Sequence, residues 1–419
     1  MRRFVLSSLV AGGILWTALA QAAIADQWLE DLPVLPGARQ EVGVAALNEK
    51  VYVIGGIPGG GGLATGRVDR FNVATGEWEV VPPLPDNAEL HHMGAAVADG
   101  KLYTIGGLTE SFAGVNTVFA FDPTTNLWLP GDSIASLPTP RGGMGVATLG
   151  DAIYAAGGQF GGTSFTDFAV FFPAENRWEE LPPMPTARNH LAAVAHNGLF
   201  YAVGGRDGGI LSGKLEVYDP GARMWNTLEP LLTPRAGITA SVVFDEIFVF
   251  GGEGNTARPD GIFPQTESYS IELGCWYPRL DMAAPRHGIG SAVVEIGLVP
   301  HILIPGGSPV QGFGVTDVHD AFLPGTPPWE SDIVFRRGES NRDGTLDLSD
   351  AVFTLFWLFI ATSEIPCEDA LDANDDGALD IADPIYTLEY LFTGGMPPPP
   401  PGPDLPGVDP TADKLTCEE

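Results

Sequence analysis

The chain is poor in positive charge. It has 21 lysines and arginines against 53 aspartates and glutamates, which gives a formal net charge of −32 over 419 residues. Such an excess of carboxylates repels nucleic acid and anionic membrane surfaces, so we expect neither as a partner. For most of these acids, solubility outside the cell is the simplest role.

Cysteine is nearly absent, with three residues in the whole chain. Two of them, Cys367 and Cys417, lie in the C-terminal part, and we expect them to form a disulfide that ties the tail back in an oxidising compartment. The third, Cys275, stands beside Trp276, and we expect it to pack as a small buried residue.

Long apolar runs are missing except at the start. Arg2 and Arg3 precede the apolar stretch Phe4–Ala20, and small residues follow it up to Ala25. This pattern predicts a signal peptide over residues 1–25 that is removed on export, with a membrane anchor as the alternative. No later segment approaches the roughly 18 apolar residues of a membrane span. We therefore expect a secreted or cell-surface protein without a membrane span after signal removal.

Common enzyme motifs are also missing. The chain has no phosphate loop, no Gly-x-Ser-x-Gly and no His-Glu-x-x-His. Three of its seven histidines, His91, His190 and His287, stand near the starts of expected inner strands. A ring of histidines can bind a metal, but their angular spread favours ordinary polar residues at the strand entrances.

What the sequence does contain is repetition with a period near fifty residues. A Gly-Gly doublet follows a short apolar run in six places: Gly55-Gly56, Gly106-Gly107, Gly157-Gly158, Gly204-Gly205, Gly251-Gly252 and Gly306-Gly307. A tryptophan recurs in step with it: Trp28, Trp78, Trp128, Trp178, Trp225 and Trp276. One supersecondary unit copied around an axis, with this period, predicts a propeller of four-stranded blades.

The order of apolar run, Gly-Gly, loop, aromatic-Asp pair and tryptophan resembles the kelch repeat family. The resemblance covers about three quarters of the chain and implies an all-β six-bladed kelch propeller over residues 26–324. The sixth unit lacks its tryptophan strand, and residues 26–33 look like a last strand without a unit. We expect the N-terminal strand to complete the blade made mainly of residues 286–324, which removes an exposed edge.

An arginine opens five of the six units, and Leu90 takes its place in the other. These residues are Arg39, Arg141, Arg188, Arg235 and Arg286. Symmetry places them in a ring, and one hypothesis is an electropositive channel mouth that binds a carboxylate-bearing ligand, an acidic peptide or an acidic sugar. The alternative is that each arginine bonds to backbone or to an acid of the neighbouring blade.

Two acidic segments near the C-terminus are copies of each other, at residues 339–350 and 372–383. Each has oxygen-bearing side chains at positions 1, 3, 5, 9 and 12, and glycine at position 6, with a backbone carbonyl expected from position 7. This spacing lets a short loop wrap a calcium ion, so we expect two calcium sites. The predicted ligands are Glu339, Asn341, Asp343, Thr345, Asp347 and Asp350, then Asp372, Asn374, Asp376, Ala378, Asp380 and Asp383.

Each loop runs into an expected helix, at Ala351–Ile360 and Pro384–Phe392. The pair resembles a dockerin-type module, a small α-helical calcium-binding domain related to the EF-hand. We expect this module, with its proline-rich tail, over residues 336–419, after a linker at residues 325–335. The resemblance implies a cohesin-like receptor, but positions 10 and 11 lack the usual pair of hydroxyl residues. Another surface or secreted receptor, or a purely stiffening role for calcium, are the alternatives.

Together these features favour an extracellular binding or adhesion protein, whose partner is an extracellular polysaccharide or a surface protein. The alternative is a carbohydrate-active kelch enzyme. The sialic-acid mutarotase type implies arginine and glutamate near the channel, and four glutamates are candidates: Glu216, Glu246, Glu253 and Glu267. The copper oxidase type needs a Tyr-Cys pair and two histidines, which the surroundings of Cys275 do not supply.

Overall fold

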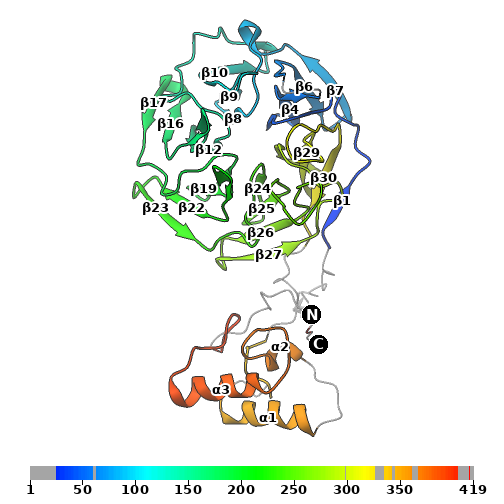
Figure 1. The fold of residues 1–419 in the computed structure, drawn as a ribbon, viewed down its shortest axis with the longest axis vertical. Helices are drawn as coiled ribbons and strands as arrows, with labels where there is room; N and C mark the ends of the chain where they lie inside the picture. The colour runs from blue at the N-terminus through cyan, green and yellow to red at the C-terminus, as the bar shows by residue number, and fades with distance from the viewer. Residues whose placement is uncertain are drawn as a thin grey trace, which may run out of the picture.

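The protein forms a β-propeller followed by a small helical region (Figure 1). In this computed structural model, the description covers residues 25–59, 63–297, 299–325, 335–341, 345–360, 367–403 and 415. The predicted signal peptide lies almost wholly outside these residues, as does the predicted linker.

Six antiparallel four-stranded sheets surround a central axis. The first three, from inner to outer strand, are β3 (Gly43–Leu47), β4 (Lys50–Ile54), β6 (Val68–Asn72), β7 (Glu77–Val81); β8 (Gly94–Ala98), β9 (Lys101–Leu108), β10 (Gly114–Asp122), β11 (Leu127–Trp128); and β12 (Gly145–Leu149), β13 (Ala152–Ala156), β16 (Phe168–Phe172), β17 (Arg177–Glu180). The six-bladed prediction is confirmed.

The other three sheets follow the same order. They are β18 (Ala192–His196), β19 (Leu199–Val203), β22 (Leu215–Asp219), β23 (Met224–Leu228); β24 (Thr239–Val243), β25 (Glu246–Phe250), β26 (Thr266–Ser270), β27 (Cys275–Arg279); and β28 (Ala292–Ile296), β29 (Val299–Pro305), β30 (His319–Leu323) with β1 (Gln27–Leu29). Short ribbons extend the loops after the second strands: β2 (Arg39–Gln40) with β5 (Ile57–Pro58), β14 (Gln159–Phe160) with β15 (Thr163–Ser164), and β20 (Arg206–Asp207) with β21 (Ile210–Leu211).

The ring is closed by its N-terminal strand, as the sequence predicts. Strand β1 pairs antiparallel with β30, and Trp28 lies opposite Phe322. The carboxylate of Asp26 accepts hydrogen bonds from the Arg279 guanidinium at 2.6 and 3.0 Å, and from the backbone N–H of Gly325 at 2.8 Å. The first and last strands of the propeller therefore form one sheet that also bonds to the fifth blade.

The repeated tryptophans join neighbouring blades. The indole N–H of Trp78 donates to the Pro33 carbonyl at 2.8 Å, and that of Trp128 donates to the Pro82 carbonyl at the same distance. Equivalent bonds leave Trp178, Trp225 and Trp276. Because each ring also packs on an aromatic residue of its own blade, one side chain supplies both apolar contact and a polar anchor.

The Gly-Gly doublets sit where neighbouring blades approach most closely. Gly55 has φ +59°, and a Cβ placed on it would lie 2.5 Å from the carbonyl oxygen of Leu90 in the next blade. The N–H of Gly56 donates to that same carbonyl at 2.9 Å. A side chain here would break the contact between blades, so glycine is required.

The C-terminal region contains α1 (Leu348–Phe359), α2 (Glu368–Leu371) and α3 (Ala382–Thr393). Helices α1 and α3 pack on each other, and both begin slightly before the predicted ranges. Phe335, Cys367, Ala370 and Leu371 form a small core beneath them. Within the described residues, none of the helices has the length and apolar character needed to cross a membrane.

Candidate functional site in the central channel

The innermost residue of each blade belongs to a closed ring of backbone hydrogen bonds around the channel. The N–H of each of these residues donates to the carbonyl of the preceding one, at 2.7–3.0 Å. In chain order the ring is Glu41, His92, Gly143, His190, Gly237 and Gly288. Every member has a positive φ, between 53° and 69°.

Three ring members are not glycine, although this backbone conformation favours glycine. Glu41, His92 and His190 have φ values of 55°, 56° and 53°. A side chain in a left-handed backbone position costs on the order of 1 kcal/mol or more, and such positions concentrate at functional sites. The chain uses glycine at the other three positions, so the three side chains mark the place where function is to be sought.

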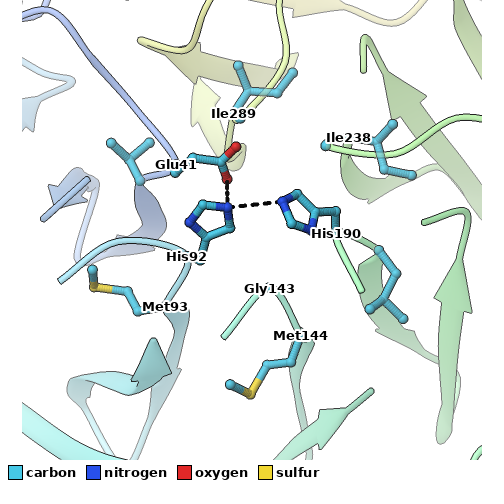
Figure 2. Close-up of a pocket in the computed structure, with 12 residues that line it drawn as sticks. Glu41, His92, Met93, Gly143, Met144, His190, Ile238 and Ile289 are labelled. Carbon is cyan, nitrogen blue, oxygen red and sulfur yellow. Dashed lines mark hydrogen bonds and ion pairs between the residues drawn. The ribbon is translucent and has the colours of Figure 1, made fainter. Parts of the chain in front are cut away.

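These three side chains converge in the channel (Figure 2). Nε2 of His92 lies 3.0 Å from Nε2 of His190 and 3.2 Å from Oε2 of Glu41. One donor atom from each residue falls within a group whose members are all within 4.8 Å of one another. Nitrogen and oxygen atoms at this spacing can hold a proton network or a metal ion.

Further ionisable groups surround this trio. Arg206 donates to Glu253 at 2.6 Å and to Nε2 of His190 at 3.0 Å. Nδ1 of His287 lies 3.6 Å from the Glu253 carboxylate and 3.8 Å from that of Glu41. The channel therefore gathers two carboxylates, one guanidinium and several imidazoles from five of the six blades.

Apolar side chains flank this polar layer. The residue after each ring member is buried in the cores of the blades: Val42, Met93, Met144, Leu191, Ile238 and Ile289. Above the ring lies a cavity of about 140 Å³, bounded by the loops that follow the second strands. Exposed Phe112 and Phe313 stand at its edge, with ring centroids 6.3 Å apart, and Gln40 and Gln159 line its wall.

Burial governs the protonation of this site. It raises the pKa of Glu41 to about 7 and lowers that of His92 to about 3. Burial, then the neighbouring His92 and Arg206, also holds the pKa of His190 well below its usual value. At neutral pH the imidazoles of His92 and His190 are therefore neutral, with lone pairs available as metal ligands or proton acceptors.

The five blade-opening arginines do not form the predicted electropositive mouth of the channel. All five arginines are at most 1% exposed. Their guanidinium groups donate to backbone carbonyls of their own blades, as Arg235 does to Gly251 at 2.8 Å and Arg141 to Gly157 at 2.8 Å. Four also pair with a carboxylate: Arg39 with Asp69, Arg188 with Glu216, Arg235 with Glu267 and Arg286 with Asp320. The prediction that they bind a ligand is thus corrected, because the groups are buried and already bonded.

The comparisons with known proteins agree with this architecture. Residues 42–252 match the family model for the KLHDC2/KLHL20/DRC7 Kelch-repeats domain. The chain is also 30% identical over 339 residues to the Kelch-like protein terF of Aspergillus terreus, across 76% of this chain and 70% of that protein. The chain belongs to the kelch-repeat family.

Two further proteins are similar to parts of this chain. Beta-scruin of Limulus polyphemus is 30% identical over 159 residues, which is 35% of this chain and 16% of that protein. A solved structure entitled "Structure of YjhT" superposes with a TM-score of 0.58 at 17% sequence identity, covering 69% of this chain and 95% of that one. The structural likeness shows a shared fold.

The candidate glutamates of this kelch propeller separate into two groups. Glu216, Glu246 and Glu267 are buried in the blades as partners of Arg188, Arg279 and Arg235. Only Glu253 reaches the channel cavity. Cys275 is free, but it is half-buried where the sequence predicts a buried residue, and its Sγ lies 3.0 Å from the Tyr277 hydroxyl. Because both residues lie on the outermost strand of a blade, this pair is remote from the channel.

Sequence reasoning identified His190 and His287 but passed over Glu41, His92 and Arg206. It also judged the histidines too widely spread to cluster. A usable signal was present: the ring residue stands two positions after each blade-opening arginine, or after Leu90. Glycine stands at three of these six positions, and the other three residues, Glu41, His92 and His190, are the functional candidates.

The second acidic loop of the C-terminal region is fully described. Asp372 and Asp383 are both 0% exposed. The Asp372 carboxylate accepts from the N–H groups of Asp376 at 3.3 Å and Gly377 at 2.9 Å. Oδ2 of Asp383 accepts from the Asp380 N–H at 2.9 Å, while Oδ1 has no hydrogen-bond partner among the described residues. Burial, then the Asp372 carboxylate, raises the pKa of Asp383 to about 7.

The first loop repeats part of this arrangement. The Asp350 carboxylate accepts from the N–H groups of Asn341 at 3.2 Å and Asp347 at 2.8 Å, as Asp383 does from Asp380. Asp343 lies outside the described residues, so the predicted ligand set of this loop is seen only in part. Cys367 is disulfide-bonded, and its predicted partner, Cys417, also lies outside the described residues.

Proposed function

We propose that the chain is an extracellular binding protein whose kelch propeller captures its ligand at the channel mouth. The observation that carries this proposal is the cavity above the ring, where ionisable, amide and exposed aromatic groups from different blades meet. The predicted signal peptide supports export, and the low content of basic residues supports a role away from nucleic acid and anionic membranes.

The chemistry of the cavity favours a carboxylated saccharide. Arg206 is 24% exposed and can pair with a ligand carboxylate, the role first given to the buried arginines. Gln159 lines the same cavity and is partly exposed, so its amide can bond to a hydroxyl group. Phe112 and Phe313 offer apolar faces to a sugar ring. A surface protein with acidic side chains is the second ligand class.

Array binding tests this proposal. The purified full chain is applied to glycan and peptide arrays, together with Phe313→Ala and Arg206→Gln. We expect binding to uronic-acid or sialic-acid glycans that falls at least about fivefold in both variants, since each removes a contact worth about 1 kcal/mol or more. The control is Phe244→Ala, because Phe244 is 59% exposed, as Phe313 is 57%, but lies at the far end of its blade. Equal binding by all variants would contradict a site at this mouth.

We further propose that the C-terminal region is a dockerin-like calcium module that attaches the chain to a surface or a partner protein. The residues of the second loop fit a hard cation. Two buried carboxylates, Asp372 and Asp383, lie close together, and one oxygen has no partner within the described residues. A calcium ion bound by oxygen ligands would neutralise this charge and satisfy that oxygen.

Calorimetric titration of chelator-stripped protein tests the module. We expect calcium binding to the wild type, loss of one site in Asp383→Asn, and weaker binding at the other site in Glu339→Ala. Thermal unfolding should show that calcium stabilises the helical region by mass action while the propeller transition stays in place. The absence of any calcium heat from folded, stripped protein would rule the module out.

Catalysis is the second candidate function, favoured by one observation: Glu253, Arg206 and neutral histidines lie together in one cavity. Such groups can transfer protons on a bound sugar. A turnover assay on any glycan that the array identifies distinguishes the two functions, because a binding protein releases its ligand unchanged.

A further inference from the structure

The hydrogen bonds around the channel histidines leave several lone pairs facing one another. Nε2 of His91 lies 3.0 Å from the carbonyl oxygen of Thr109 and must donate to it, since a carbonyl only accepts. A neutral imidazole carries one N–H, so Nδ1 of His91 is an acceptor. It contacts Nδ1 of His92, which must therefore donate. This leaves Nε2 of His92 with a lone pair that points at the channel.

The hydrogen bonds of His190 fix its tautomer in the same way. Its Nδ1 lies 2.5 Å from Oδ1 of Asn189, and the Asn189 amide nitrogen donates to the Ser164 hydroxyl at 2.7 Å, which fixes the amide orientation. His190 therefore donates from Nδ1 and presents a lone pair at Nε2. That atom is 3.0 Å from Nε2 of His92, which is itself 3.2 Å from the Glu41 carboxylate.

His287 adds a further unsatisfied group to this cluster. Its Nε2 lies 3.0 Å from the Val310 carbonyl and donates to it. Its Nδ1 is buried and has no hydrogen-bond partner among the described residues. The nearest charged groups on that side are the carboxylates of Glu253 and Glu41. The carboxylates of Glu41 and Glu253 thus converge on this nitrogen, beside the lone pairs of His92 and His190.

We propose that this site binds one divalent transition-metal ion of the Zn²⁺ class through the Glu41 carboxylate and Nε2 of His92 and His190. Two imidazoles and a carboxylate are a donor set for such metals, whereas calcium and magnesium prefer oxygen. Zinc bonds of about 2.0–2.1 Å to tetrahedral ligands place those ligands roughly 3.3 Å apart. The distances from Nε2 of His92 to the other two donor atoms, 3.0 and 3.2 Å, are close to this value. The site is separate from the C-terminal loops and does not depend on the proposed ligand.

The surroundings complete the arrangement of an open metal centre. Thr109 and Asn189 accept from the histidine network and orient its rings, as the outer partners of metal-bound histidines do. Arg206 donates to Nε2 of His190. When a metal takes that lone pair, Arg206 keeps its other hydrogen bond, to Glu253 at 2.6 Å. The fourth coordination position faces the cavity of about 140 Å³, where water or a ligand oxygen fits.

Metal titration of the full chain tests this proposal. Chelator-stripped protein is held in excess calcium, so that the acidic loops are occupied, and Co²⁺ and then Zn²⁺ are added. We expect one equivalent of Co²⁺ to produce the intense visible absorption of a four-coordinate ion, and one equivalent of Zn²⁺ to abolish it. In Glu41→Gln, a nearly isosteric change, we expect affinity to fall at least about 100-fold, and in Asn189→Ala about 10- to 100-fold.

The control is His196→Gln, because His196 lies at the end of strand β18, away from the ring, and pairs with Asp245. It should bind metal like the wild type. Thermal unfolding confirms that each variant is folded; should His92→Gln fail to fold, Glu41→Gln and the cobalt spectrum still decide. Folded wild type that gives no cobalt band, or one-equivalent binding that is unchanged in Glu41→Gln, would overturn the proposal and leave a shared-proton network.

Discussion

At the scale of single residues, polar groups in this propeller divide into two kinds. The arginines that open the blades are buried and bonded within their blades, so they hold the Gly-Gly turns in place. Glu41, His92 and His190 instead occupy left-handed positions and face a cavity. The first kind repeats with the fold, whereas the second breaks the repeat, and a break in a repeat is the better indicator of function.

Removing a blade-opening arginine should damage stability. In Arg235→Ala, the carboxylate of Glu267 stays buried without its 2.9 Å partner, so we expect a loss of about 3–5 kcal/mol in the free energy of unfolding. Urea unfolding measures it. The control is Arg258→Ala, whose partner Asp260 is at the surface, and where we expect at most about 1 kcal/mol. Equal small losses in both variants would restore the arginines as candidates for a binding role.

His319 should make stability depend on pH. It packs between Phe71 and Trp78, donates to the Pro33 carbonyl, and burial lowers its pKa from 6.5 to about 4. Because the folded pKa is depressed, the unfolded chain takes up the proton first as pH falls. The contribution is full above pH 6.5 and is lost between pH 6.5 and 4, roughly 3 kcal/mol in total.

Urea unfolding of the wild type and His319→Gln across this pH range measures that contribution. Glutamine keeps a donor for the Pro33 carbonyl but does not titrate. We expect the variant to lose less stability than the wild type on acidification. Parallel pH profiles would show that His319 does not carry the effect.

At the scale of elements, closure of the propeller depends on strand β1. Strand β1 supplies the outer strand of the last blade, and Asp26 binds Arg279 and Gly325 across the closure. Deletion of residues 26–36 should abolish cooperative unfolding of the propeller, because it opens a sheet edge and leaves Arg279 with fewer partners. Circular dichroism on heating reports this.

Trp28→Ala is a milder change to the same strand. We expect it to lower the free energy of unfolding by about 3–5 kcal/mol while the propeller stays closed. A deletion variant that melts like the wild type would contradict the closure.

The propeller blades were predictable from the sequence because the glycine and tryptophan repeat marks each of them. The glycine doublets, the tryptophans and the unpaired first strand predict six blades and their closure, because these residues act locally or at a fixed period. The predicted helices Ala351–Ile360 and Pro384–Phe392 begin a few residues after the first residues of α1 and α3 in the structure. In the structure Asp347 caps α1 by accepting from the Ser349 N–H, which places the first turn before the apolar run.

At the scale of the whole molecule, the site was less predictable because it forms only when the ring closes. Glu41 and His190 lie in separate blades, far apart in the sequence, and His92 was hidden beside the more obvious His91. The sequence indicates which residues line the channel, but the contact of His92 with both Glu41 and His190 depends on ring closure. The function of the molecule, in this account, is concentrated on its axis.

Anomalous X-ray diffraction at the zinc edge tests that claim most directly, with crystals grown in the presence of Zn²⁺ and excess Ca²⁺. We expect one zinc peak bounded by Glu41, His92 and His190, with its open side towards Arg206 and Glu253. A well-ordered channel without a zinc peak, or zinc found only elsewhere on the protein, would contradict it.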